Sequence, residues 1–211
     1  MSKIILIGGP PRCGKTTLAQ KISREIGIMW VSTDAFDDIA QKYVSEDKKD
    51  SLFPKTALRI KSGGGNDEMY EAFSVESIVS AYRKQAETVH KAIESFVACA
   101  NKEGWDYVIE GYHVTPKLIS TLRAKDLKVS STILISTRAE EAVKRSIESN
   151  VKDDWLRDKT KKQETFSKIA TMIELYSTKL KQEAEEFNTN VIDIAGDFQG
   201  KLKEAFELLI K

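Results

Sequence analysis

Eight residues near the amino terminus have the types and spacing needed to hold phosphate groups. Residues 9–16, GPPRCGKT, fit the pattern G-x-x-x-x-G-K-[ST]. Glycines let such a loop curl so that its backbone N–H groups point inward, and the following helix adds unpaired N–H groups. Lys15 supplies a positive charge for the β- and γ-phosphates, and Thr16 supplies a hydroxyl for Mg²⁺. We therefore expect ATP and Mg²⁺ to bind here, with the nucleotide held by Gly9, Pro10, Arg12, Cys13, Gly14, Lys15, Thr16 and Thr17.

The segments on either side of this loop are those that must position it. Residues 4–7, IILI, form an unbroken apolar run, which is typical of a strand buried on both faces. After the loop, Leu18, Ile22 and Ile26 recur at helical spacing, and Gly27 marks a helix end. A glycine turn with an incidental lysine would not require this order of strand, loop and helix.

Strands and helices continue to alternate along the chain. Further strands are predicted at 29–33, 106–109, 128–135 and 190–194, and the main helices at 35–43, 75–102, 116–124, 139–148, 166–187 and 200–211. This alternation favours a parallel sheet with helices on both faces. We expect one domain, 1–211, with a three-layer αβα P-loop NTPase fold and a five-stranded parallel sheet.

Two segments of this domain are expected to close over ligands. The helical region 35–100 follows the second strand and would bind a phosphoryl acceptor. Within it, 45–50 is predicted to be a charged, solvated connection, and the glycine-rich 62–67 the most flexible stretch. Residues 150–165 are strongly charged, carry Trp155 and would form a lid.

Polar residues follow the second and third strands, at the sheet edge where parallel sheets bind ligands. Asp34 could accept a substrate proton or hold Mg²⁺ through water, or it could cap the next helix. Glu110 could hold Mg²⁺, directly or through water, contact the acceptor, or be a structural acid. Gly111 would let a ligand approach the backbone, and His113 could contact the acceptor or lie at the surface. Asp34, Glu110, Gly111 and His113 are the predicted substrate-binding residues.

Arginines near the lid are candidates for contacts to the transferred phosphate. Arg145 and Arg157 flank the lid, and guanidinium groups match phosphate oxygens and stay charged. Together with Lys15 and Asp34, they are the predicted catalytic residues. Arg138 begins a helix and could instead be solvated.

Three residues are weaker candidates. Asp37 and Asp38 lie one helical turn beyond Asp34 and could share its face, although solvated surface acids are commoner. Cys13 could have a lowered thiol pKa at a helix start, or could simply be a small residue in a tight turn.

Composition restricts the classes of partner. The 211 residues include 33 basic and 32 acidic ones, a balance that disfavours a non-specific grip on nucleic acid. The apolar run at the amino terminus is too short for a membrane span, and two cysteines give no disulfide framework. We expect a cytoplasmic protein.

The segment EGYHVTP, residues 110–116, resembles the glutamate-glycine-x-histidine segment of 2-phosphoglycerate kinases. It stands where nucleoside monophosphate kinases have an aspartate-glycine turn. The similarity continues through Arg145 and Arg157 into 166–169 and 173–176. The resemblance implies ATP- and Mg²⁺-dependent phosphoryl transfer to a small molecule like 2-phosphoglycerate, with a lid that excludes water.

Other functions stay open. The enzyme could be a nucleoside or nucleotide kinase, or the protein could be a nucleotide-binding regulator with little transfer activity. A kinase for nucleic-acid ends is disfavoured by the charge balance, and a GTPase switch by residues 101–104, NKEG, which lack the aspartate of N-K-x-D. The long helices could form the seam of a homodimer, or their apolar stripes could face the core.

Overall fold

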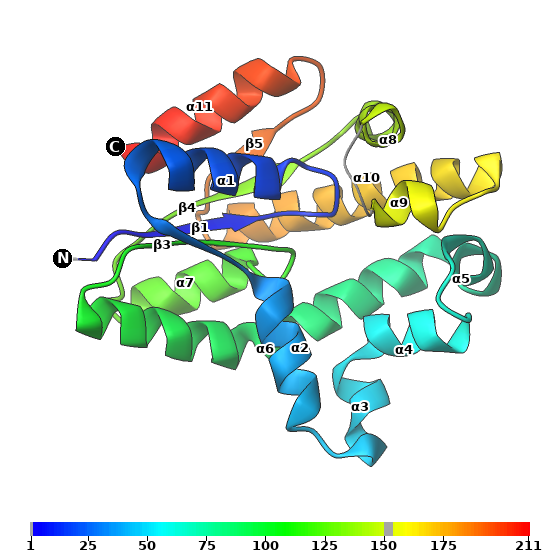
Figure 1. The fold of residues 1–211 in the computed structure, drawn as a ribbon, viewed down its shortest axis with the longest axis horizontal. Helices are drawn as coiled ribbons and strands as arrows, with labels where there is room; N and C mark the ends of the chain where they lie inside the picture. The colour runs from blue at the N-terminus through cyan, green and yellow to red at the C-terminus, as the bar shows by residue number, and fades with distance from the viewer. Residues whose placement is uncertain (1, 150–153) are drawn as a thin grey trace.

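The computed structural model describes residues 2–149 and 154–211, and within these ranges the strands form one five-stranded parallel sheet (Figure 1). The strand order is β2-β3-β1-β4-β5, and each neighbouring pair is parallel. The strands are β1 (Ile4–Gly8), β2 (Met29–Ser32), β3 (Tyr107–Glu110), β4 (Val129–Ile135) and β5 (Val191–Asp193). The predicted fold class is confirmed.

The central strand β1 explains where the ligand-binding edge lies. Its five residues are all buried, because β3 and β4 flank it and helices cover both faces. Ile7 pairs with Glu110 of β3, and Ser32 of β2 pairs with the same glutamate. The carboxyl ends of three strands therefore meet at one level, which brings the loops after them together.

Helices cover both faces of the sheet. Figure 1 shows α1 (Lys15–Ile26) and α11 (Phe198–Ile210) on one side, and α6 (Val75–Glu103) and α7 (Pro116–Ala124) on the other. The helix α10 (Gln163–Glu186) packs on α6, α7 and β4, and α8 (Ala139–Glu148) packs on α10. The apolar stripes of α6 and α10 are buried in this core, so the fold of a single chain accounts for them. A homodimer remains a prediction.

Four short helices lie between β2 and α6, and they form the helical insertion. They are α2 (Thr33–Lys42), α3 (Glu46–Leu52), α4 (Pro54–Lys61) and α5 (Asn66–Ala72), grouped on the outer side of α6 (Figure 1). Residues 45–50 are largely exposed, as predicted, but they are not a simple connection, because α3 begins at Glu46. Acidic Glu46 and Asp47 occupy the first turn of α3, where their negative charges stabilise the helix by interacting with the positive end of its dipole.

The segment 62–67 also differs from its prediction. Gly63 and Gly64 make a left-handed turn, but Asn66 and Asp67 are buried at the start of α5. Their side chains accept and donate hydrogen bonds to the segment that precedes α10. Asn66 and Asp67 are therefore held by contacts, and the flexibility of 62–65 stays a prediction.

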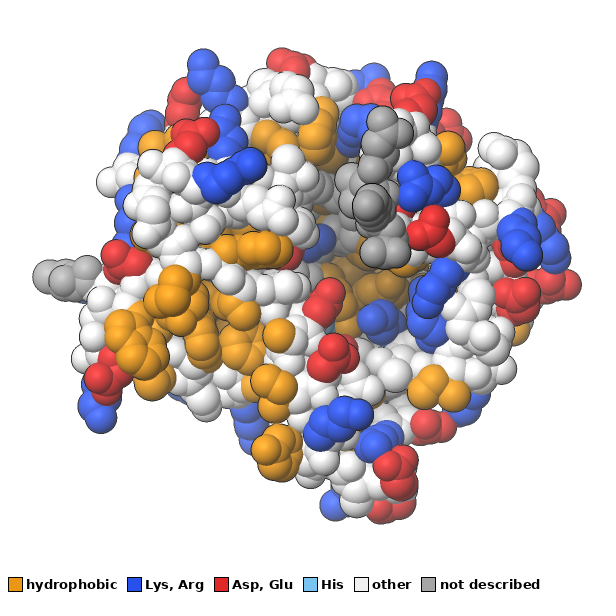
Figure 2. All heavy atoms as spheres, in the orientation of Figure 1, with side chains coloured by type: hydrophobic (Ala, Val, Ile, Leu, Met, Phe, Trp, Pro, Cys, Tyr) orange, Lys and Arg blue, Asp and Glu red, His pale blue; other side chains and the backbone are white. Residues whose placement is uncertain are grey.

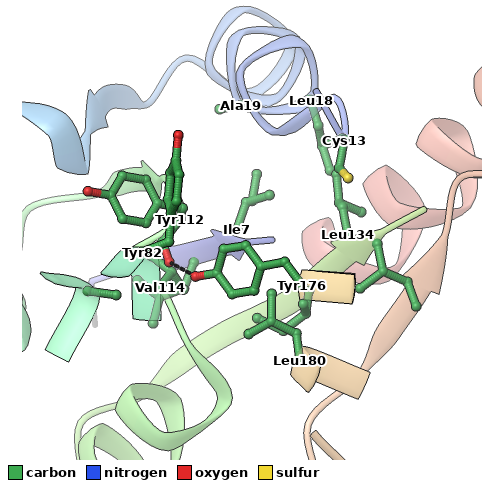
Figure 3. Close-up of a cluster of buried hydrophobic side chains, with 14 of the residues drawn as sticks. Ile7, Cys13, Leu18, Ala19, Tyr82, Tyr112, Val114, Leu134, Tyr176 and Leu180 are labelled. Atoms are coloured by element: carbon green, nitrogen blue, oxygen red, sulfur yellow. Dashed lines mark hydrogen bonds between the residues drawn. The ribbon is translucent and has the colours of Figure 1, made fainter. Parts of the chain in front are cut away.

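Three tyrosines fix the loop that follows β3. Figure 3 shows Tyr176 of α10 pointing toward this loop, where its hydroxyl donates to the backbone oxygen of Tyr112 at 3.3 Å. The rings of Tyr82 and Tyr112 meet edge to face, with centroids 4.9 Å apart. The position of the loop thus depends on packing from α6 and α10.

Across 2–149 and 154–211, no helix combines the length and apolar character that a membrane crossing requires.

Candidate active site

The loop at residues 9–16 has the curled backbone that phosphate binding needs. Arg12 and Gly14 have φ angles of 65° and 79°, in the left-handed region. A Cβ at Gly14 would also lie 2.9 Å from the Phe198 ring, so glycine is required there both for conformation and for space. Lys15 is the first residue of α1, and its Nζ donates to the Pro10 oxygen at 2.6 Å. The lysine ammonium therefore lies across the loop.

Thr16 and Glu110 are brought together beside this loop. The Thr16 hydroxyl donates to Glu110 Oε1 at 3.1 Å. Burial raises the pKa of Glu110, and the Lys15 charge and the Thr16 hydrogen bond oppose that rise. A hydroxyl and a carboxylate are the hard oxygen ligands that Mg²⁺ prefers, together with water and substrate phosphates. In the described part of the chain, no group of three or more His, Cys, Asp or Glu residues is placed to hold a metal ion.

Asp34 is near these residues but is not placed as the sequence predicts. Strand β2 ends at Ser32, α2 begins at Thr33, and Asp34 therefore lies in the first helical turn. The helix cap is Ser32, whose hydroxyl accepts from the Asp34 N–H at 3.3 Å. The alternative of Asp34 as the cap is wrong. Its carboxylate is 70% exposed, with Oδ1 4.0 Å from His113 Nδ1.

The structure explains glycine at position 111 differently from the prediction, in which it would let a ligand approach the backbone. Its φ is 152°, and a Cβ there would lie 1.8 Å from Thr33 Oγ1. Close packing of the β3 loop on α2 therefore requires the glycine, because the Thr33 side chain fills the space that a Cβ at position 111 would occupy. Its role as a substrate contact stays a prediction.

His113 is fully buried, so the alternative of a surface histidine is wrong. Its Nδ1 is 2.8 Å from Thr33 Oγ1, and its Nε2 is 3.9 Å from Asp37 Oδ2. Burial first, and the Lys55 charge second, lower the pKa of His113 well below 6.5. The imidazole is therefore neutral near pH 7.

The structure adds residues that sequence reasoning missed or ranked low. Asp37 is buried and accepts from Gln85 Nε2 at 2.8 Å, and burial raises its pKa. The Lys55 ammonium lies 5.3 Å from the centre of the Tyr112 ring. For Asp37, the sequence did contain a signal, which is its position one helical turn beyond Asp34. Tyr112 lies in the 110–116 segment, at its variable position. Lys55 and Gln85 belong to no motif and come near it only through packing of the helical insertion on α6.

The described part of the lid lies against the phosphate-binding loop. The two terminal nitrogens of Arg12, Nη1 and Nη2, donate to Asp154 at 2.7 and 2.5 Å. The Arg12 guanidinium also stacks on Trp155, 4.9 Å from the ring centre. Arg12 thus binds the lid in this structure, and its contact with a phosphate stays a prediction.

The same part of the lid also contacts the helical insertion. Asn66 Nδ2 donates to the Trp155 oxygen at 3.1 Å and to Thr160 Oγ1 at 2.9 Å. Asp67 accepts from the backbone N–H groups of Lys161 and Lys162. The lid is therefore joined to both the predicted nucleotide side and the predicted acceptor side.

The predicted catalytic arginines have other partners. Arg145 of α8 lies 4.3 Å above the Phe198 ring, near the loop, and burial lowers its pKa. Arg157 in α9 (Trp155–Asp158) donates to the Ser149 oxygen at 2.8 Å and pairs with Asp158. Arg138 is largely exposed and pairs with Glu141. Lid residues 150–153 lie outside the described residues, and the phosphate contacts of these arginines stay predictions.

Cys13 does not have the lowered pKa that its position could give. The thiol is fully buried, and burial raises its pKa from 9.0 to about 12 despite the nearby Lys15 charge. It is therefore a protonated, packed side chain under the loop, beside Leu18 and Leu134 (Figure 3). The alternative of a small residue in a tight turn agrees with this geometry.

Comparisons with known proteins agree with the fold. A family model described as "ATPase family associated with various cellular activities (AAA)" matches residues 5–55. No curated protein matches the sequence. A gluconokinase structure from Sinorhizobium meliloti 1021 aligns over 99% of this chain and 91% of its own, with 14% identity and a TM-score of 0.53.

A second solved structure is similar over an equal span. It is described as a sugar kinase from Janibacter sp. HTCC2649, and it aligns over 100% of this chain and 95% of its own. The identity is 13% and the TM-score 0.54. At these identities the likeness concerns the fold. The chain thus has the α/β P-loop NTPase fold, in an arrangement similar to that of structures described as small-molecule kinases.

Proposed function

We propose that this protein is a kinase that transfers the γ-phosphoryl group of ATP to a hydroxyl of a small molecule. The observation that carries the proposal is the group formed by Lys15, Thr16 and Glu110 at the carboxyl edge of the sheet, with the Asp34 carboxylate beside it. Phosphoryl transfer needs positioned charge more than covalent chemistry, and these residues supply it.

Each residue has a distinct task in this proposal. Lys15 and the start of α1 stabilise negative charge on the transferred group. Thr16 and Glu110 would hold Mg²⁺, and the bound ion would neutralise negative charge on the phosphates of ATP. Asp34 accepts the proton of the attacking hydroxyl as its oxygen bonds to phosphorus and the bond to ADP breaks. The lid, held by Arg12 and α5, excludes water that would otherwise accept the phosphoryl group.

The candidates for the acceptor come from similarity to other proteins and not from the residues around the reacting atoms. The resemblance to 2-phosphoglycerate kinases favours 2-phosphoglycerate, and the similar structures are described as acting on gluconate or sugars. The AAA match at residues 5–55 favours a second candidate, a nucleotide-binding regulator whose slow hydrolysis needs no acceptor.

An assay of ADP release tests the proposal. The panel holds 2-phosphoglycerate, gluconate, neutral sugars and nucleosides, each with ATP and Mg²⁺. We expect one acceptor to raise turnover above the acceptor-free rate, and Lys15→Ala to lower that turnover by about 10²- to 10³-fold. Lys203→Ala on the exposed face of α11 is the matched control and should keep wild-type turnover. Turnover that survives Lys15→Ala would contradict the mechanism.

A further inference from the structure

Three buried polar side-chain atoms, on residues that lie close together in the fold, have no hydrogen-bond partner among the described residues. They are Asp37 Oδ1, Tyr112 Oη and His113 Nε2, and their side chains are at least nine-tenths buried. The rings of Tyr112 and His113 lie 3.7 Å apart between centroids, and Nε2 is 3.9 Å from the other Asp37 oxygen. Buried polar atoms almost always have partners, so three together mark a place prepared for a ligand.

The hydrogen-bonding pattern of these atoms matches hydroxyl groups. Asp37 uses one oxygen to accept from Gln85, so the other is an available acceptor. The nearby Asp37 carboxylate favours the tautomer of His113 with hydrogen on Nε2, so that the Thr33 hydroxyl donates to Nδ1. An acceptor thus lies beside a donor, with the Tyr112 phenol next to them. A hydroxyl both donates and accepts, so it can satisfy both neighbours.

The Lys55 ammonium lies near this group and has no counter-charge bonded to it among the described residues. Lys55 Nζ lies 5.3 Å from the Tyr112 ring centre and 5.7 Å from that of Tyr82, and it forms no hydrogen bond or ion pair within 2–149 and 154–211. Arg59, one turn later on α4, already donates to the Gly64 oxygen and to Asn66 Oδ1. Separately, the face of the molecule drawn in Figure 2 is hollowed near its middle, with hydrophobic side chains inside the hollow and both basic and acidic side chains along its walls.

We propose that the acceptor is a small polyhydroxylated monocarboxylate, held by its hydroxyls on Asp37, Tyr112 and His113 and by its carboxylate on Lys55. The proposal rests on the proposed function, because it names the substrate of the same site. One ammonium balances one carboxylate, whereas a neutral polyol would bring Lys55 no counter-charge beyond its contacts with the Tyr82 and Tyr112 rings. A phosphorylated acid such as 2-phosphoglycerate would bring two acidic groups to a site that already holds Asp34 and Asp37.

Binding calorimetry on the full-length protein, with Mg²⁺ and an unreactive ATP analogue, tests this directly. The probes are threonate and xylonate, their neutral counterparts threitol and xylitol, and 2-phosphoglycerate. We expect the two acids to bind about 10- to 100-fold more tightly than their alditols, which is the range of one charge-assisted hydrogen bond. Both acids should also bind more tightly than 2-phosphoglycerate.

Variants separate the charge from the hydroxyl contacts. Lys55→Gln should remove the preference for the acids and leave alditol affinity unchanged, whereas Asp37→Asn should weaken acids and alditols alike. Lys61→Gln is the matched control, because Lys61 is a more exposed lysine of the same helix and pairs with Asp50. Lys55 is only half-buried, so the Lys55→Gln variant is expected to fold even if Asp37→Asn is unstable.

Three results would overturn the inference: equal binding of acids and alditols, tighter binding of 2-phosphoglycerate, or unchanged acid affinity in Lys55→Gln. Absence of any binding by threonate or xylonate would overturn it as well. These outcomes are distinct from failure of the proposed function. Turnover of a nucleoside without binding of the acids would reject the inference and keep the kinase, whereas binding without phosphoryl transfer would keep the site and reject the kinase.

Discussion

Replacing Arg12 by methionine should release the lid from the phosphate-binding loop. Methionine keeps much of the aliphatic length of the side chain and removes its charge. The Arg12 guanidinium makes two hydrogen bonds to Asp154, whose carboxylate is 0% exposed, and it stacks on Trp155. The Arg12→Met variant therefore leaves a buried carboxylate without its counter-charge.

The size of the effect follows from the contacts that remain. Breaking a buried ion pair by removing one partner costs about 3–5 kcal/mol. Asp154 still accepts from the N–H groups of Leu156 and Arg157, and Arg12 itself is 18% exposed. We therefore expect a value at or below the lower limit of this range, about 2–3 kcal/mol in the free energy of lid opening. The control Arg24→Met, on the exposed face of α1, should change it by less than about 0.5 kcal/mol.

Hydrogen exchange measured by mass spectrometry reads the lid directly. Amides around 155–162 should exchange about 30- to 150-fold faster in Arg12→Met, while those of β1 keep their protection. Acrylamide should also quench Trp155 fluorescence more strongly. Unchanged exchange together with a large loss of ATP affinity would refute the reasoning, because Arg12 would then act on the phosphates and not on the lid.

Three further predictions concern individual side chains. Burial lowers the pKa of His90 from 6.5 to about 4. As pH falls between these two values, His90 is protonated in the unfolded chain but stays neutral in the folded one. The free energy of unfolding should therefore drop by about 3 kcal/mol from this residue between pH 7 and pH 4, and urea titrations of His90→Gln should show a smaller drop than wild type. Iodoacetamide should alkylate exposed Cys99 and leave buried Cys13 unmodified in the native protein, as peptide mass mapping can check; equal labelling would contradict the burial of Cys13. Glu110→Gln should raise the Mg²⁺ concentration needed for half-maximal turnover with little change in nucleotide affinity, and an unchanged Mg²⁺ dependence would remove Glu110 from the metal site.

The nucleotide side of the site is predictable from the sequence because its determinants are local. Residues 9–16 and α1 follow each other directly, so the motif, the strand before it and the helix after it specify the loop together. Glu110 is predictable for a related reason. Parallel strands end at one edge, so a residue at the end of β3 must lie near the end of β1.

The acceptor side depends on packing that no short segment encodes. Asp37, Lys55 and Gln85 come from three helices and meet only when α2, α4 and α6 assemble. The helix α3 has no buried residue, so its sequence lacks the apolar period that would have revealed it. The contact between Arg12 and Asp154 joins residues 142 positions apart, which local patterns cannot predict.

The most direct test of the account follows the γ-phosphoryl group itself. ATP labelled at the γ-phosphorus is incubated with the protein, Mg²⁺ and the acceptor panel, and the products are separated. The account predicts label in a phosphorylated acceptor, formed in equal amount with ADP and lost in Lys15→Ala. Label found only in inorganic phosphate, with every acceptor unmodified, would contradict the central claim that this protein transfers phosphate to a small-molecule hydroxyl.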